Sequence, residues 1–596
     1  MADPLTLRKL AFLAPDPVEG DPPEIEDVPT VTILVGPNNS GKSKALQEIA
    51  AWCAGVNESR VIWKEISVHP PTNAEIGLEM FQVFKVEPEN GEHEEQDAIF
   101  CQYNRFLPIN PVFRGNVTKE RISAALISLR NEINSESRRH ITEPFMIHID
   151  VLSRLKIIED CPVNNNNSSH KRNPIYKLFY NDESRKNFRN IIFDHTRKYI
   201  TIDPTNISKL QLKLNDKEPA SNQEEQGLHR EARDYHSKGT RVIFMGDGIK
   251  ALIGIFLLLV DSPHKTILLD EPEIFLHPSL SRALGLKISQ IMTASRSSLV
   301  VATHSADFLM GCIESGARVA IARITYDGGN PTARTILADE IRSLMRSPLI
   351  RSTQALRGLF CKAVILSEGD RDRAFYEEIN RRLMECGGGI SDSIFMNGFG
   401  ADFLHRIAGP LRRFGVKVAL IYDLDVIVED SQWMNIHTLV TAAESDKQQI
   451  NENRTKVKQY LINSGSDNEI PNYKKKGIYS IYGSERRELE QLIERLNIDG
   501  LFFVPVGEVE GWLKGLFTRQ PRKKKWLELM FDALGSDPES ETYVVPSQGD
   551  VWGFLRTIAR WCNSLPGQMA NPSERDPRAP DATPFAGSST LSRGAG

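Results

Sequence analysis

Two short stretches contain residues whose types and spacing could carry chemistry. The first is VGPNNSGKS, residues 35–43, and the second is LSEGDRDRAFY, residues 366–376. Glycines spaced ahead of a lysine and a serine are typical of a loop that binds the phosphates of a nucleotide. Acids that follow an apolar run have no role in such a loop. The sequence therefore predicts two chemically different sites.

The first stretch fits the pattern GxxxxGK[ST] between a strand candidate, VTILV, and a helix candidate, KSKALQEIAAW. In this context backbone amides curl around the phosphates and the helix N-terminus adds partial positive charge. Lys42 is expected to reach the terminal phosphates and Ser43 to bind Mg²⁺, so the expected cofactor is ATP with Mg²⁺. The predicted nucleotide-binding residues of the loop are Gly36, Pro37, Asn38, Asn39, Ser40, Gly41, Lys42 and Ser43.

A second apolar run, TILLDEP (266–272), ends in two acids. We expect Asp270 to hold the magnesium, directly or through water, and Glu271 to polarise the attacking water. Farther along, VVATHS places His304 after another strand candidate, where its side chain could sense the γ-phosphate. Acids at a strand end are common on surfaces and a lone histidine is usually structural, but the upstream loop favours the functional interpretation.

Acids also follow two apolar runs in the second half of the chain. Glu368 and Asp372 follow AVILS, and Asp423 and Asp425 follow KVALIY, 55 residues after Glu368. Ligand sites in a parallel α/β sheet gather beyond the carboxyl ends of the strands, so we expect these acids to converge. Carboxylates at one edge repel one another unless a hard cation such as Mg²⁺ or Mn²⁺ neutralises them. Such an ion could act on a phosphodiester, with Glu368, Asp423 and Asp425 as its predicted ligands.

A third apolar run, LFFVPV, precedes VGEVEGWL (506–513), which offers Glu508 and Glu510 as candidate ligands of a second metal. Two acids at the start of a helix also suit its dipole, and the sequence does not choose between them. The run RKKKW (522–526) and the arginines of residues 341–362 are candidate phosphate contacts. Runs of cations are more often a solvated face.

The order of these motifs resembles the ABC-type ATPase heads and TOPRIM domains of the OLD (overcoming lysogenisation defect) family, including nuclease subunits of Gabija-type phage defence and fused relatives of the PARIS system. FCKAVILSEGDRDRAFY is similar to the junction between the two domains in that family. The resemblance implies an α/β fold: an ABC-type P-loop ATPase head with an internal insertion, followed by a TOPRIM domain with a Rossmann-like parallel sheet. It covers residues 30–50 and about 240–515, and it leaves most of 61–240 unexplained.

The resemblance also implies partners. Heads of this class sandwich ATP between two protomers, so a homodimer or higher homo-oligomer is expected, with residues 61–240 as a candidate dimerisation region. FMGDGIKAL (244–252) stands where the signature loop is expected, and Gly246 and Gly248 are its predicted phosphate-capping residues. The serine-rich LSGGQ form is missing, which leaves the strength of dimer closure open. His277 also fits the class, and a second defence-system protein is a further expected partner.

The implied function is an ATP-regulated, metal-dependent endonuclease in defence against phage, with DNA as the favoured substrate. A toxin that cleaves RNA, such as tRNA, is the first alternative, because a metal-bound phosphodiester looks alike in both nucleic acids. A nucleotide-gated clamp that binds nucleic acid without cutting it is the second. An ATP-hydrolysing sensor that recruits another effector is the third.

Composition bounds these interpretations. The chain has 596 residues, a formal net charge of −5 and seven cysteines without a CxxC pair. Any surface for nucleic acid must therefore be local, and neither a disulfide framework nor a zinc site is indicated. The longest apolar run, ALIGIFLLLV, is half the length that a bilayer requires, so no membrane partner and a cytoplasmic location are expected.

The patterning predicts an ordered series of segments, including exposed loops at 163–173 and 217–227. The expected domains are 1–60, the ATPase N-terminal part with the P-loop; 61–240, the ATPase remainder and insertion; 241–340, the ATPase C-terminal part; 341–362, a basic linker; 363–520, the TOPRIM domain; 521–564, a helical extension; and 565–596, a disordered tail.

Overall fold

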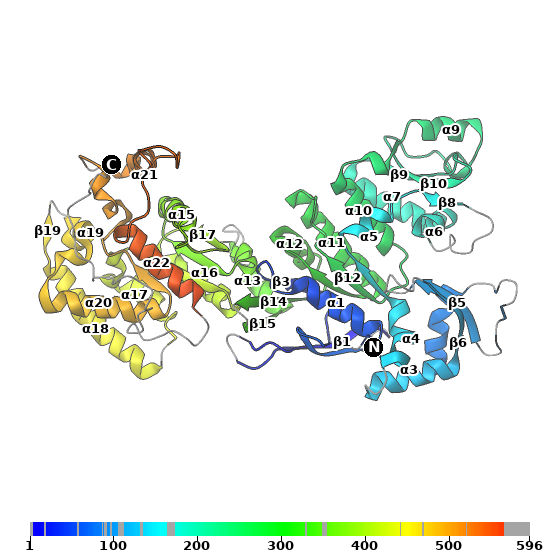
Figure 1. Cartoon of the computed structure of the whole chain (residues 1–596), viewed down its shortest axis with the longest axis horizontal. Helices are drawn as coiled ribbons and strands as arrows, with labels where there is room; N and C mark the ends of the chain where they lie inside the picture. Colours follow the sequence, from blue (N-terminus) through cyan, green and yellow to red (C-terminus); the bar gives the residue numbers. More distant parts are fainter. Residues whose placement is uncertain are drawn as a thin grey trace. The chain divides into compact units, whose positions relative to one another are not determined.

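The chain forms two compact units, residues 1–343 and 344–596 (Figure 1). The expected tail, 565–596, and residues 349–354 of the expected linker lie outside the described part of the chain. The computed structural model describes residues 4–16, 20–56, 59–85, 88, 92–93, 95, 98–104, 112–131, 135–163, 173–327, 330–348, 355–441, 443–467, 470–519 and 521–564.

The first unit is built around a six-stranded sheet in the order β15-β14-β3-β13-β12-β7. Five strands are parallel, and the edge strand β15 runs antiparallel to β14. Every residue of β3 and β13 is buried, which explains their unbroken apolar sequences. The strands are β3 (Val31–Val35), β7 (Met146–Ile149), β12 (Thr266–Asp270), β13 (Ser298–Ala302), β14 (Val319–Asp327) and β15 (Asn330–Leu337).

Helices cover this sheet and bring the connecting loops to its edge. The helix α10 is buried along most of its length, as its sequence DGIKALIGIFLLL predicts. A Cβ atom on Gly254 of α10 would lie 1.9 Å from the backbone oxygen of Arg154, so only glycine allows α10 to pack this closely on α5. The helices are α1 (Lys42–Cys53), α5 (Val151–Lys156), α10 (Asp247–Leu259), α11 (Pro278–Ser295), α12 (Ala306–Glu314) and α13 (Ala338–Met345).

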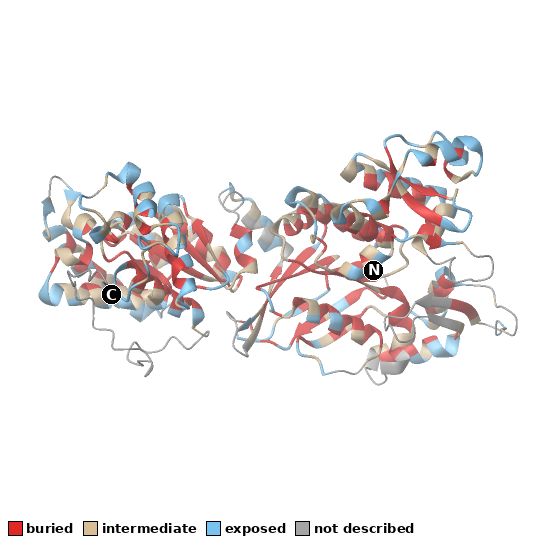
Figure 2. Cartoon of the chain, turned by 45° about the horizontal axis from the view of Figure 1, so that its top comes forward, coloured by how far each residue is buried: buried red, intermediate tan, exposed pale blue. Residues whose placement is uncertain are grey.

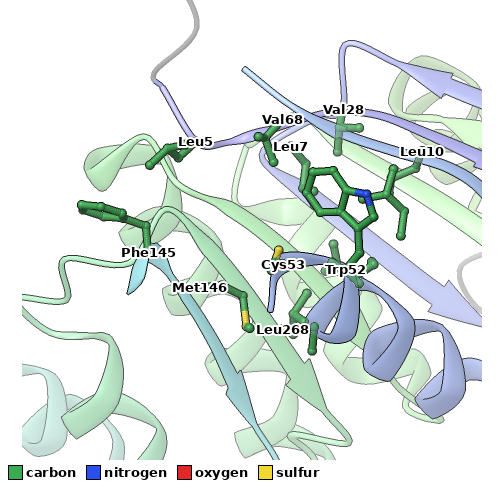
Figure 3. Packing of buried hydrophobic residues seen from close by; sticks show 14 of the residues in the cluster. Leu5, Leu7, Leu10, Val28, Trp52, Cys53, Val68, Phe145, Met146 and Leu268 are labelled. Carbon is green, nitrogen blue, oxygen red and sulfur yellow. The ribbon is translucent and has the colours of Figure 1, made fainter. Parts of the chain in front are cut away.

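A smaller antiparallel sheet, β2-β1-β4, shares a hydrophobic core with α1 (Figure 3). Leu10 and Trp52 are buried in this core, together with Phe145 just before β7. Residues after position 60 therefore contribute β4 and β7 to the body of the first unit. The strands of the smaller sheet are β1 (Leu7–Phe12), β2 (Glu24–Glu26) and β4 (Trp63–Val68).

The remainder of residues 61–240 forms two groups of elements beside that body (Figure 1). One face of α3 is apolar, and its Ile122 and Leu126 are buried. The first group contains α2 (Ala74–Glu79), β5 (Ala98–Asn104), β6 (Val112–Thr118), α3 (Lys119–Asn131) and α4 (Ser135–Thr142). The second contains β8 (Cys161–Pro162), α6 (Pro174–Tyr180), α7 (Asp182–Thr196), β9 (Tyr199–Asp203), β10 (Lys209–Asn215), α8 (Asn222–Gln226), α9 (Arg230–Ser237) and β11 (Thr240–Arg241).

The prediction of an exposed loop at 217–227 is confirmed only in part. Residues 217, 218 and 220–223 are exposed, but Asn222–Gln226 form α8, and Glu225 is fully buried there. The Glu225 carboxylate accepts hydrogen bonds from Arg185 and Arg189 of α7, at 2.9 Å and 2.5 Å. These partners lie well upstream, so the polar composition of the segment itself carried no sign of burial.

The second unit contains a fully parallel sheet in the order β17-β16-β18-β21, whose strands are mostly buried (Figure 2). Two helices, α15 and α16, and two strands, β17 and β18, lie between Glu368 and Asp423. The elements of this core are β16 (Ala363–Ser367), α15 (Asp370–Glu385), β17 (Ser393–Asn397), α16 (Ala401–Arg413), β18 (Lys417–Tyr422), β21 (Leu501–Phe503), α21 (Trp526–Leu534) and α22 (Asp550–Asn563).

A long helical excursion connects β18 to β21, two neighbouring strands of this sheet. It carries a basic segment, NYKKK, on a short helix. Its helices are α17 (Asp430–His437), α18 (Glu444–Asn463), α19 (Asn472–Lys476) and α20 (Gly483–Ile498). Among all described helices, none combines the length and apolar character needed to cross a membrane.

Candidate active sites

The glycine loop lies between β3 and α1, as predicted. The Lys42 ammonium is buried inside it, where Nζ donates to the backbone oxygens of Gly36 and Pro37 at 3.0 Å and 2.8 Å. Gly36 has φ of 146°, and a Cβ atom there would lie 2.0 Å from the backbone oxygen of Ile324 in β14. Only glycine therefore lets the loop leave the sheet at this point. The loop is folded around a positive charge.

Ser43 and Asp270 are brought together from positions 227 residues apart. The Ser43 hydroxyl donates to Asp270 Oδ1 at 3.1 Å. Burial raises the pKa of Asp270 above its ordinary value, and the neighbouring Glu271 carboxylate raises it further, while the Ser43 hydrogen bond opposes the rise. A hydroxyl and a carboxylate at this spacing are the protein groups that hold Mg²⁺ in nucleotide sites of this kind.

Glu271 and His304 also lie at this edge. His304 Nε2 is 3.6 Å from Glu271 Oε1, and both side chains are about one-third exposed. The backbone amide of His304 donates to Glu273 Oε1 at 2.6 Å, which fixes the loop after β13 against the loop after β12. The four predicted residues Ser43, Asp270, Glu271 and His304 therefore face one region.

Sequence reasoning missed Arg154, which is fully buried beneath this edge. Its guanidinium donates to the backbone oxygens of Asp270 and Glu271, at 3.3 Å and 2.9 Å. Arg154 holds the two acids in place by their main chain. The apolar run FMIHI before it, which forms β7, was the available signal.

The glycines of the expected signature loop differ from one another. Gly246 caps α10, and a Cβ atom there would meet no other atom within 4 Å. At Gly248 a Cβ atom would lie 2.5 Å from the backbone oxygen of Phe275, so this glycine has a packing role. Asn39 adopts a left-handed conformation in the P-loop. His277 caps α11, where its Nδ1 accepts from the amide of Ser279.

In the second unit, Glu368 and Asp423 meet. They follow β16 and β18, which are adjacent parallel strands, and the backbone amide of Asp423 donates to Glu368 Oε1 at 2.9 Å. The parallel register pairs Ser367 with Ile421, so both strands end at the same level. The predicted convergence of these two positions is therefore observed.

The acids at this edge act on one another electrostatically. Burial raises the pKa of Glu368 to about 7, with further contributions from Asp425 and Asp372. Burial also raises the pKa of Asp372 to about 6, and Glu510 and Glu508 add to the rise. For Asp423 the pKa lies well above its ordinary value, because burial is reinforced by Glu368, Asp372, Asp425 and Glu508. The six predicted carboxylates share one field of like charge.

Two of these acids have local structural contacts as well. Asp372 Oδ2 accepts from the amide of Gly369 at 2.9 Å and thereby caps α15. Glu508 precedes the 3-10 helix Val509–Gly511. Only Glu508 of the late pair is among the main acidic neighbours of Asp423, whereas Glu510 acts on Asp372 ahead of Glu508.

Lysines enter the acidic edge from two segments. Lys474 Nζ donates to Asp425 Oδ2 at 2.7 Å, and Lys523 donates to Glu508 Oε2. Burial opposes the charged form of Lys474, but the hydrogen bond with Asp425 and the attraction of Asp425, Tyr473 and Glu508 together outweigh it and raise the pKa of Lys474. Lys523 belongs to the predicted basic run, whereas Lys474 was missed because its segment lies 49 residues beyond Asp425.

The donor set suits a hard divalent cation, because it consists of carboxylate oxygens whose mutual repulsion a metal would relieve. Within the described residues, however, no group of three or more His, Cys, Asp or Glu side chains is gathered closely enough to hold a metal ion. Lysine ammonium groups already bind oxygens of Asp425 and Glu508. Metal binding therefore requires side chains at this edge to rearrange.

Comparisons with known proteins match part of each unit to a recognised domain. Residues 102–311 match the family described as "AAA domain, putative AbiEii toxin, Type IV TA system", a range that begins after the P-loop. Residues 359–425 match the family described as "Overcoming lysogenization defect protein-like, TOPRIM domain". The chain thus combines an AAA-type ATPase domain with an OLD-like TOPRIM domain, which confirms the predicted α/β architecture.

One similar protein is a nuclease named Old. The chain is 21% identical over 316 residues to the Old nuclease of Escherichia phage P2, an alignment that covers 49% of this chain and 50% of that protein. The chain thus spans about half the length of the relative that it matches.

Solved SMC head structures were also found. The SMC head domain from Thermotoga maritima is 14% identical, with a TM-score of 0.27, 56% of this chain and 99% of that chain covered. The SmcHead bound to the C-winged helix domain of ScpA is 13% identical, with a TM-score of 0.32, 57% of this chain and 99% of that chain covered.

Proposed function

We propose that this chain is a divalent-metal-dependent nuclease whose TOPRIM unit cuts nucleic acid under the control of its ATPase unit. The observation that carries the proposal is the hydrogen bond from the Asp423 amide to Glu368, which joins acids from two strand ends at one sheet edge. The OLD-like TOPRIM match over these residues and the similarity to an Old nuclease support it.

The chemistry follows from the carboxylates. Glu368, Asp423 and Asp425 are the residues that would hold a divalent cation, and Glu508 is the better placed of the late acids for a second. A cation bound there would supply a polarised phosphate and a more acidic bound water. The Asp423 amide orients the Glu368 carboxylate, and the cap on α15 orients Asp372.

The ATPase unit would bind ATP through the loop around Lys42, with Mg²⁺ at Ser43 and Asp270. Glu271 would polarise the attacking water, and His304 lies beside Glu271, with Nε2 3.6 Å from Oε1. Control of cleavage requires ATP to favour one arrangement of the protein over another. Pairing of two chains around nucleotide is the arrangement that we propose. We further propose DNA as the substrate and defence against phage as the role.

A cleavage assay tests this function. The purified chain is offered DNA and RNA with Mg²⁺ or Mn²⁺, with and without ATP, alongside the variants Glu368→Gln and Asp423→Asn. We expect both variants to lose about 10²-fold or more in cleavage rate, because charge that holds the metal is removed. Glu377→Gln is the matched control, since Glu377 lies on α15 but pairs with Arg373. Variants that cut as fast as wild type would refute the proposal.

A clamp that binds nucleic acid without cutting it is the second candidate. It is favoured by the lack, among the described residues, of an assembled cluster of three metal-binding side chains. ATP-dependent retention of DNA together with intact substrate under both metals would support the clamp. If the protein cleaves RNA and not DNA, the proposed metal-dependent cleavage stands, and the substrate is RNA.

A further inference from the structure

The backbone of Lys474, whose side chain binds Asp425, is fixed by packing against a neighbouring loop. Lys474 lies on α19, whose backbone packs against the loop that precedes Glu508. At Gly507 a Cβ atom would lie 2.3 Å from the backbone oxygen of Lys474, and Gly507 has φ of 98°. The Gly507 oxygen in turn accepts from the amide of Leu424, at 3.2 Å, between the two aspartates of the strand end. The segments that carry Lys474, Glu508 and Asp425 are therefore packed as one assembly.

Of the lysines on α19, Lys474 binds a carboxylate of the site. Lys474 and Asp425 are partly buried, with side-chain exposures of 32% and 24%. The backbone oxygen of Lys475 accepts a hydrogen bond from Lys514 Nζ at 3.2 Å. Lys476 is exposed. A partly shielded pair retains more of its attraction than an exposed one does.

We propose that Lys474 is a built-in counterion, which competes with the divalent cation for Asp425 and binds a substrate phosphate once the metal has displaced it. The proposal rests on the proposed function. The Nζ–Oδ2 contact occupies an oxygen that the metal would use, so the two cations exclude each other there. A lysine side chain has a flexible four-carbon stem and three donors, so its head can move to a nearby anion while its backbone stays in place.

Electrostatics gives the direction of this exchange. Before metal binds, the ammonium groups of Lys474 and Lys523 offset part of the acidic charge. A divalent cation at Asp425 brings two positive charges to the same position and repels Lys474. A phosphate of a nucleic acid bound at the metal would then offer Lys474 another anion. Metal binding would thus prepare a phosphate contact.

Metal binding in the absence of nucleic acid tests whether Lys474 competes with the divalent cation for Asp425. Mn²⁺ affinity is measured by calorimetry for wild type, Lys474→Met, Lys474→Arg and Lys476→Met. We expect Lys474→Met to bind Mn²⁺ about 10-fold more tightly, because its competitor is gone. Lys474→Arg keeps the charge, and its affinity should not exceed that of wild type. Lys476→Met removes one charge from the same helix and should change the affinity less than about twofold.

Nucleic-acid binding tests whether the displaced Lys474 binds a substrate phosphate. With Ca²⁺ as the divalent cation and a short DNA duplex, we expect Lys474→Met to weaken binding about 10-fold and to reduce its salt dependence, and Lys476→Met to do so much less. Unchanged or weaker Mn²⁺ binding by Lys474→Met would overturn the inference, as would unchanged DNA binding. If either of these results is obtained and the wild-type protein still cleaves nucleic acid, the proposed role of Lys474 fails and the proposed function stands. If wild type binds no Mn²⁺ at millimolar concentration, the inference and the proposed function both fail.

Discussion

Buried carboxylates occur in both units, but their surroundings differ. Glu225 of the ATPase unit has two arginines on one oxygen and a backbone amide, that of Ile202, on the other. Asp423 of the TOPRIM unit has four acids as its main electrostatic neighbours. The first carboxylate is neutralised by the chain itself. The second lacks comparable neutralisation and is suited to a cation from outside.

This difference separates a structural acid from a functional one more clearly than burial does. An acid that folding has already paired contributes to stability and offers nothing to a ligand. Acids that repel one another store unfavourable energy, which a metal can release on binding. A fold that keeps such a group of acids is less stable than one in which some of them are replaced by neutral residues. The comparison can be sharpened by neutralising each acid in turn.

The largest effect is expected at Glu225. Glu225→Gln leaves two arginines without their carboxylate in a buried place, and we expect a loss of about 3–5 kcal/mol in the free energy of local opening. Hydrogen exchange of peptides from β9 and β10 measures this quantity. Glu218→Gln is the control, because Glu218 is an exposed partner of Arg189, at 3.6 Å. It should cost less than about 1 kcal/mol. If Glu225→Gln and Glu218→Gln lower the opening free energy equally, Glu225 is not the structural acid that we describe.

A smaller effect of opposite sign is expected at Asp423. Without divalent metal, Asp423→Asn removes one of several repelling charges and adds an amide that can donate to the neighbouring carboxylates. We expect the opening free energy of β18 to rise by about 1 kcal/mol, while cleavage is lost. Hydrogen exchange at pH 8 in chelator provides the measurement. Destabilisation would indicate that Asp423 is a structural acid like Glu225.

The predictable part of the molecule consists of contiguous patterns. The P-loop and the strands β3, β12, β16 and β18 follow from short apolar runs and local motifs, because a strand buried on both faces leaves a continuous signal. The meeting of Glu368 with Asp423 follows from the rule for strand ends in parallel sheets.

The unpredicted part consists of single side chains that arrive from distant segments. Arg154 supports the acids after β12 through their backbone oxygens, and no spacing rule relates it to them. Lys474 reaches Asp425 only because a helical excursion folds back onto the strand end. Glu225 has a polar local sequence, and its burial depends on arginines of another helix. Long-range packing determines each of these contacts.

The central claim is that carboxylates from separate strands hold a divalent cation. A crystal structure with Mn²⁺, located by anomalous scattering, tests it most directly. We expect an ion about 2.1–2.2 Å from oxygens of Glu368 and at least one of Asp423 and Asp425, with Lys474 displaced. Absence of Mn²⁺ from this edge, with the Lys474–Asp425 contact intact at saturating metal, would contradict the account.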